Sequence, residues 1–189
     1  MSFGRLSLLT MAVVGSLAAG EPKPKSKNAE PDLPPLNTKV VKFCREQLGK
    51  KVTNGQCASL AVEALREAGA KRFPLENSGG DYVWGREIES FKEALPGDIL
   101  QFRDAAFKGR RVLSGNRILT WHEAYSHHTA VVTAVKEQGK VITVLHQNTG
   151  PDGSSDDEMM KVKEGKLHLD AFQPGGKIWI YRPVPLTED

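Results

Sequence analysis

The stretch from Asn54 to Gly69 constrains the fold of this chain more than any other. Its apolar residues recur every three or four positions, as on one face of an α-helix. Thr53 or Asn54 can cap the start of this helix, and Gly69 can end it. The apolar positions are Cys57, Leu60, Ala61, Ala64, Leu65 and Ala68. The pattern predicts a helix that packs one face against a core and carries a cysteine in its first turn.

The position of Cys57 at the start of a helix favours a reactive thiol. Unpaired backbone N–H groups and the positive end of the helix dipole favour a thiolate at the start of a helix. Cys57 is therefore a candidate nucleophile. Two other interpretations stay open: Cys57 is simply part of the apolar face, or it forms a disulfide with Cys44, which would remove the nucleophile.

The N-terminal region has the features of a secretory leader. Arg5 precedes an apolar run that ends in Ala18-Ala19-Gly20, which predicts a signal peptide over residues 1–20. A linker rich in proline and lysine follows over residues 21–36, and a single domain over residues 37–185. We expect a secreted or periplasmic monomer. The apolar run is too short for stable membrane insertion, and a formal charge of +3 is too small to indicate nucleic-acid binding.

Helical patterns come first in the domain and strand patterns later. This order predicts an α+β fold with an antiparallel sheet. Expected helices span Thr38–Leu48, Asn54–Gly69 and Arg86–Ala94; after a turn at Leu95–Asp98, expected strands span Ile99–Phe102, His128–Val135, Val141–Asn148 and Lys177–Tyr181. The segment Asp104–His127 has no pattern that assigns it to an element.

Neither a cofactor nor a metal is expected. No glycine-rich phosphate loop precedes a helix, and the acidic residues between Asp152 and Glu158 do not have the spacing of a calcium loop. A zinc site built from His127, His128 and His146 is disfavoured because adjacent histidines point to opposite sides of a strand.

Alternation along the predicted hairpin selects partners for Cys57. His128 lies at the start of one strand, and His146 and Asn148 share one face of the next. A thiolate mechanism needs a base for the thiol proton and a third group that orients this base. The residues therefore predict Cys57 as nucleophile, His128 as base, and either His146 or Asn148 as the orienting group. His127 points to the other side of the strand, so one histidine of this adjacent pair is functional and the other incidental, and alternation favours His128.

Four motifs together resemble a known superfamily. Gly55-Gln56-Cys57, Leu95–Phe102, His128–Val132 and Val144–Asn148 are similar, in order and spacing, to the papain-like CHAP and NlpC/P60 superfamily. The resemblance implies a papain-like fold, in which the nucleophile heads a helix packed on a small curved antiparallel sheet. It also implies a cysteine amidase or endopeptidase that cleaves a peptide or peptidoglycan substrate through a thioester.

The resemblance further assigns roles to individual residues. It implies that Cys57 is the nucleophile, His128 the general base, and Gln56 a contributor to the oxyanion hole. CHAP domains usually have a glutamate where this chain has His146, whereas NlpC/P60 enzymes have a histidine. We therefore expect His146 to orient His128, with Asn148 in support.

Aromatic residues in loop-like stretches add a candidate cleft. Tyr82, Trp84 and Trp121 are expected to line a substrate cleft, although tryptophan more often packs inside a domain. One alternative function also stays open. In it, the chain is a papain-like binding or structural domain without catalysis, in which Cys57 is buried or disulfide-bonded.

Overall fold

The computed structural model describes residues 32–71, 81–150 and 153–186. The predicted signal peptide, residues 21–31 of the predicted linker and the loop expected at Asn77–Gly80 lie outside the described residues.

Within the described residues, two helices precede the sheet. α1 spans Pro35–Glu46 and α2 spans Cys57–Ala68. α2 ends as predicted at Gly69, which adopts the left-handed conformation at φ 72°. Its start differs from the prediction: the helix begins at Cys57 with Gln56 at the N-cap position, in place of Thr53 or Asn54. α1 begins three residues earlier than expected, because proline fits the first turn of a helix, where its missing N–H is not needed. Leu36 packs against the core, so the last residues of the predicted linker belong to the folded domain.

In the part of the chain that the structure describes, six strands form one antiparallel sheet in the order β1-β6-β2-β3-β4-β5. The strands span Arg86–Ile88 (β1), Ile99–Val112 (β2), Ile118–Lys136 (β3), Val141–His146 (β4), Lys163–His168 (β5) and Lys177–Arg182 (β6). Short helical turns lie at Ser114–Asn116 (η1), Glu137–Gly139 (η2), Asp156–Met159 (α3) and Leu169–Ala171 (η3). Helices first and an antiparallel sheet later is the arrangement that the sequence predicts.

The prediction of a helix at Arg86–Ala94 is wrong. Arg86–Ile88 is the edge strand β1, paired with β6 from Arg86↔Arg182 to Ile88↔Ile180, and turns follow it. The pairing with β6 outweighs the local helical pattern, because β6 supplies the backbone hydrogen bonds that a helix would otherwise provide.

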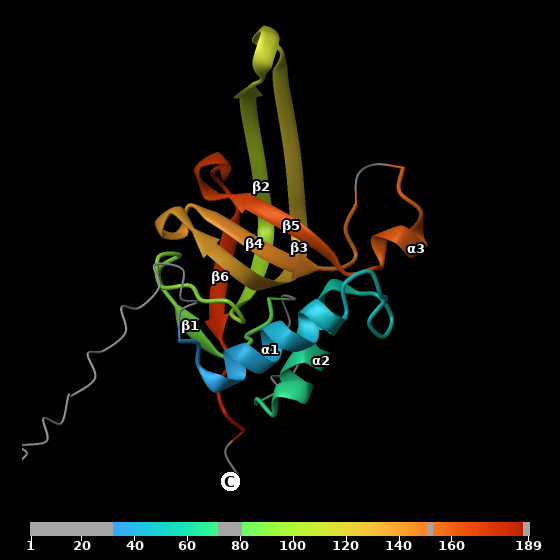
Figure 1. The fold of residues 1–189 in the computed structure, drawn as a ribbon, viewed down its shortest axis with the longest axis vertical. Coiled ribbons are helices and arrows are strands. Elements are labelled where there is room, and N and C mark those ends of the chain that lie inside the picture. The colour runs from blue at the N-terminus through green and yellow to red at the C-terminus, as the bar shows by residue number, and fades with distance from the viewer. Residues whose placement is uncertain (1–31, 72–80, 151–152, 187–189) are drawn as a thin grey trace, which may run out of the picture. The chain divides into compact units, whose positions relative to one another are not determined.

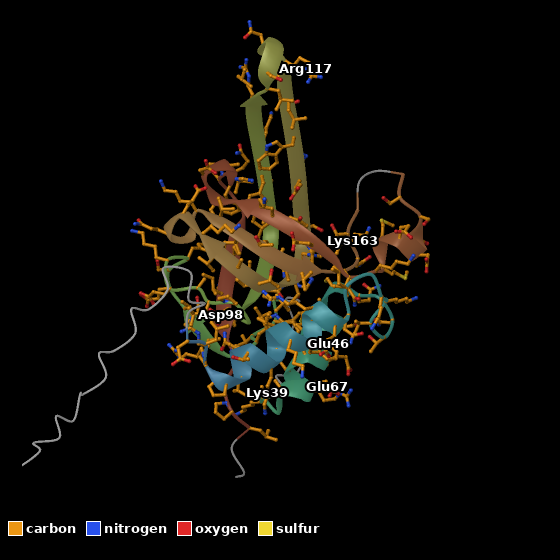
Figure 2. The ribbon with its side chains drawn as sticks, viewed as in Figure 1. Lys39, Glu46, Glu67, Asp98, Arg117 and Lys163 are labelled. Carbon is orange, nitrogen blue, oxygen red and sulfur yellow. The ribbon has the colours of Figure 1, made fainter. Side chains whose placement is uncertain are left out.

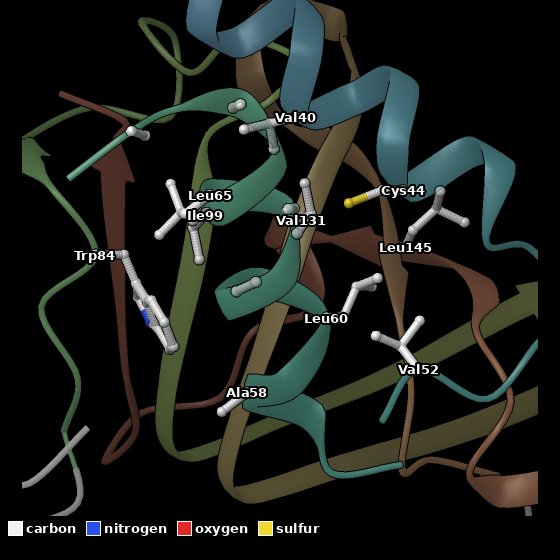
Figure 3. Close-up of a cluster of buried hydrophobic side chains, with 14 of the residues drawn as sticks. Val40, Cys44, Val52, Ala58, Leu60, Leu65, Trp84, Ile99, Val131 and Leu145 are labelled. Carbon is white, nitrogen blue, oxygen red and sulfur yellow. The ribbon is translucent and has the colours of Figure 1, made fainter. Parts of the chain in front are cut away.

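The two faces of the sheet bury separate cores. On one face, α1 and α2 pack against side chains such as Ile99, Val131 and Leu145 (Figure 3). The helices lie on this side of the sheet in Figure 1. The opposite face buries the alternate residues of the same strands, among them Leu100 and Val132. We call these the helix face and the outer face.

The segment that the sequence left unassigned is a long hairpin. β2 and β3 pair from Ile99↔Val131 to Val112↔Ile118. β6 pairs with β2 only up to Arg103, and β4 pairs with β3 only from Val131, so the rest of the hairpin is a two-stranded ribbon that projects from the sheet (Figure 1). We call residues 108–122 the arm.

The arm contains one packing device of its own. Trp121 pairs with Gly109 across the two strands, and a Cβ at Gly109 would lie 2.2 Å from the indole ring. The ring therefore covers the bare backbone of the glycine, as aromatic residues do across from strand glycines. His168 of β5 contacts the same ring, with ring centroids 5.8 Å apart.

The turn before β2 is fixed by a buried carboxylate. Asp98 is fully buried and accepts two hydrogen bonds from Arg182, Nε to Oδ1 at 3.0 Å and Nη2 to Oδ2 at 2.8 Å. Asn37 donates to Oδ1 at 2.8 Å, and the backbone N–H of Leu95 donates to Oδ2 at 2.8 Å. Gly97 lies so close to α1 that a Cβ would approach the backbone oxygen of Asn37 to 2.4 Å. Asp98 thus joins α1, the turn and β6.

We expect Asp98→Asn to lower the free energy of unfolding by about 3–5 kcal/mol, because it leaves Arg182 without its counter-charge and turns an N–H₂ group toward other donors. Urea denaturation measures the change. Glu67→Gln is the matched control. It removes a carboxylate paired with Arg66 on the surface, where 47% of the Glu67 side chain is exposed, and should cost less than about 1 kcal/mol. Equal losses in the two variants would contradict the role of Asp98.

Candidate functional site

The start of α2 is held by a glutamine at the end of β4. Gln147 is fully buried; its Nε2 donates to the carbonyl oxygens of Gln56 at 2.7 Å and Val52 at 3.2 Å, and its Oε1 accepts from the N–H of Val52 at 3.1 Å. These bonds fix the loop that leads into Cys57, the first residue of α2. Beside it, Asn148 Nδ2 donates to Gln56 Oε1 at 3.2 Å. The two residues predicted to support the site, Gln56 and Asn148, therefore lie together.

The thiol of Cys57 is half-buried and favours its protonated form. Burial raises the pKa of this thiol above its ordinary value of 9.0. Hydrogen bonds from the backbone of Thr129, Ala58 and Cys57 itself, and from the side chain of Thr129, oppose the rise without cancelling it. Both cysteines are free, and Cys44 is buried in the core, where desolvation raises its pKa to about 12.

Cys57 faces a polar group on the helix face of the sheet. The side chain of Thr129 on β3 hydrogen-bonds the sulfur, and the hydroxyl of Thr129 donates to Oε1 of Gln101 at 2.9 Å. Thr129 has one hydroxyl proton, and in the structure Gln101 receives it. If this proton is donated to the sulfur instead, it lowers the pKa of Cys57, although burial has the larger effect.

The orientation of the Gln101 amide is fixed by chemistry. Trp84 Nε1 lies 3.1 Å from Oε1 of Gln101, and an indole N–H can only donate. Oε1 thus receives protons from Trp84 and Thr129, and the N–H₂ end of the amide points the other way. There Nε2 of Gln101 lies 3.1 Å from Nε2 of His127. Because the amide nitrogen donates, Nε2 of His127 must be the unprotonated nitrogen of a neutral imidazole.

This arrangement keeps His127 neutral, and the lone pair of its unprotonated nitrogen is used by Gln101. A neutral imidazole has one lone pair for a proton, and Gln101 takes it. Burial lowers the pKa of His127, and the positive charge of Arg103 lowers it further, while Asp81 raises it. An imidazolium at His127 would place an N–H against the N–H₂ of Gln101. His127 therefore cannot take the Cys57 proton without breaking the bond to Gln101.

His128 and His146 form a buried pair on the outer face. Nε2 of His128 lies 3.0 Å from Nδ1 of His146, and the ring of Tyr125 stacks on His128 with centroids 4.8 Å apart. Both histidines are buried, with exposed fractions of 4% and 5%. His146 borders a cavity of about 790 Å³ that Tyr125 and Lys163 also line. Within the described residues, no group of three or more histidine, cysteine or acidic side chains is placed to hold a metal.

The structure brings His128 and His146 together but separates them from Cys57. Cys57 contacts Thr129, and successive residues of a strand point to opposite faces, so His128 lies on the other side of the sheet. The prediction that His128 is the base for Cys57 therefore fails, and His127 is the histidine on the same face as Thr129. His146 accordingly cannot orient a base for Cys57.

Asn148 does not continue the face of His146, contrary to the prediction. β4 ends at His146, and Asn148 adopts a left-handed conformation at φ 59°. The chain therefore turns toward Gln56, where Asn148 makes its hydrogen bond.

The three aromatic residues predicted to line a cleft have different surroundings. Trp84 is buried in the helix-face core, and only 1% of it is exposed. Tyr82 is half-buried and packs edge-on against His127, with centroids 5.3 Å apart, so it borders the site. Trp121 lies on the arm, six residues before His127 in β3. At the rise per residue of an extended strand, the two are about 20 Å apart.

The fold and this site define a domain of the cysteine proteinase, or papain-like, class: a cysteine heads a helix that packs on an antiparallel sheet. Residues 36–188 match the AIM3/BBC1 cysteine proteinase-fold domain, and the chain belongs to this family. Among curated proteins and solved structures, none matches the chain significantly. The family match supports the papain-like fold and does not single out CHAP or NlpC/P60.

Acid is expected to destabilise the domain through the histidine pair. Burial, with a smaller contribution from Lys163, lowers the pKa of His146 from 6.5 to about 4. Burial lowers that of His128 well below 6.5, helped by the charges of His146 and His127. The unfolded chain therefore binds more protons than the folded one below about pH 6.5, and the free energy of unfolding falls as pH drops toward the folded values. For His146 the loss is roughly 3 kcal/mol by pH 4.

Urea denaturation of the wild type and His146→Gln between about pH 4 and pH 7.5 measures this effect. The wild type should lose stability more steeply below pH 6.5 than the variant, with His122→Gln, the loss of an exposed imidazole, as control. Parallel curves for the wild type and His146→Gln would show that the pair is not responsible.

Proposed function

We propose that this chain is a non-catalytic domain of cysteine proteinase fold that binds a polypeptide segment beside Cys57. One observation carries the proposal: the amide of Gln101 donates a hydrogen bond to His127. In a thiol hydrolase, the group behind the histidine must accept a proton from it, so that the other ring nitrogen is free to act as base. Here the direction of that bond is reversed.

The protonation of the thiol supports the same conclusion. Burial raises the pKa of Cys57 above its ordinary value, and the hydroxyl proton of Thr129 goes to Gln101. With Cys57 as a thiol, hydrogen bonds can run from Cys57 to Thr129 and on to Gln101, and separately from Gln101 to His127. A thiolate and an imidazolium would reverse several of these bonds at once.

The half-exposed groups around Cys57 offer a place for a partner. Gln56 and Asn148 are exposed beside the start of α2, and Tyr82 and His127, which pack against each other, are partly exposed. These amides and rings supply donors, acceptors and an aromatic surface, the combination that recognises a peptide backbone in a groove. Secretion and a monomeric state stay predictions that accompany this proposal.

A thiol hydrolase is the second candidate, and one observation favours it. Cys57 is the first residue of α2, where backbone N–H groups approach the sulfur, as a catalytic cysteine requires. On this reading the substrate is an amide bond in a peptide or in peptidoglycan. Reactivity of the thiol separates the two candidates.

Alkylation of Cys57 by iodoacetamide, followed by mass spectrometry across a pH range, should give an apparent pKa above the ordinary value for cysteine. Cys57→Ala is the control for Cys44, which is fully buried and should not react in the native state. An apparent pKa near neutrality, or hydrolysis of a peptide or peptidoglycan substrate that is lost in Cys57→Ala, would refute the non-catalytic proposal.

Gln101→Glu tests the polarity of the network directly. A carboxylate still accepts from Trp84 and Thr129, but it also accepts from His127, which favours the imidazolium and through it the thiolate. We expect the alkylation rate of Cys57 at pH 7 to rise by about tenfold or more, the effect of one pKa unit. Gln101→Met, which is similar in size and has no amide, should not raise the rate. An unchanged rate in Gln101→Glu would show that Gln101 does not control the thiol.

A further inference from the structure

The arm concentrates the positive charge of the chain. Residues 108–122 contain Lys108, Arg110, Arg111 and Arg117 and no aspartate or glutamate, for a formal charge of +4. The whole chain has a formal charge of +3, so the remaining residues together carry −1. Figure 2 shows Arg117 near the end of the arm, away from the sheet. A charge held in this way attracts an anionic surface.

The end of the arm is also apolar and exposed. Val112, Leu113, Ile118 and Leu119 have exposed fractions of 64%, 37%, 51% and 48%. Val112 and Ile118 are directly paired and share one face of the ribbon. Leu113 and Leu119, one residue further along each chain, lie on the other face. The ribbon is therefore apolar on both faces just below its tip.

Apolar side chains on both faces indicate the nature of the partner. A groove on a folded protein covers one face of a ribbon and leaves the other in water. A lipid bilayer surrounds both faces. The turn at the tip, Ser114-Gly115-Asn116, has no charged residue. Arg117 follows it, and its long side chain can keep the guanidinium among the headgroup phosphates while its methylene groups lie in the apolar boundary.

We propose that the arm inserts its tip into the interfacial region of an anionic phospholipid bilayer. The four aliphatic side chains enter the boundary between headgroups and acyl chains, while the basic residues of the arm bind lipid phosphates and carboxylates. No helix among the described residues is long and apolar enough to cross a membrane. The proposed contact involves the tip of the arm alone, and it does not depend on the chemistry of Cys57.

Co-sedimentation of the full chain with phosphatidylcholine vesicles, with and without phosphatidylserine, tests the proposal. The chain should bind the vesicles that contain phosphatidylserine, and binding should weaken as salt is raised. Arg110→Glu/Arg117→Glu should lower the partition coefficient by more than tenfold, since each basic residue near the surface contributes about fivefold. Val112→Ser/Ile118→Ser should also lower it, by about tenfold or more, because insertion needs the apolar pair.

The matched control is Lys92→Glu/Lys140→Glu, which changes two exposed lysines outside the arm and alters the net charge equally. It should retain most of the binding, and circular dichroism should show that all variants are folded. Three results would overturn the proposal: no binding to anionic vesicles at low salt, equal losses in the control and the arm variants, or full binding by Val112→Ser/Ile118→Ser. The last result would indicate a purely electrostatic contact in place of insertion.

Discussion

The buried carboxylate of Asp98 is the constraint on which the rest of the domain depends. A charge without solvent is stable only where donors surround it, and Asp98 has Arg182, Asn37 and the backbone of Leu95. These partners come from the start of α1, the turn and the end of β6, which are far apart in the sequence. The position of β2, which leaves this turn, follows from their meeting, and β2 carries both Gln101 and one strand of the arm.

Local patterns predicted the elements that local physics determines. The helix up to Gly69 follows from its apolar spacing and its glycine stop, and the hairpin of β3 and β4 follows from alternation around Gly139. Elements that depend on distant partners were not predicted. Arg86–Ile88 is a strand because it pairs with β6, and Lys163–His168, which is rich in charged residues and glycine, is a strand because it pairs with β4. The arm escaped because neither face of its outer part is buried, so its sequence shows no alternation of apolar and polar residues.

The site was predicted in part for a related reason. Alternation shows that neighbouring histidines diverge, but it does not show which of the two faces α2 will cover. Which face α2 covers depends on the packing of the helix-face core. This packing places Thr129 and His127 on the same face as Cys57, and it leaves His128 and His146 on the outer face. Gln101 was missed although it carried a signal: a glutamine between Leu100 and Phe102 interrupts an apolar strand, and a buried polar group requires fixed partners.

The amide of Gln101 also bears on how such a domain can evolve. Glutamine and glutamate have nearly the same shape, and their codons differ by a single base. The direction of the hydrogen bond to His127 can therefore reverse through one nucleotide, while Cys57, the core and the arm stay as they are. Under the proposed function, the polarity of the network beside Cys57 can thus change without a new residue at the nucleophile, so the presence of the cysteine alone does not distinguish a binding domain from a hydrolase.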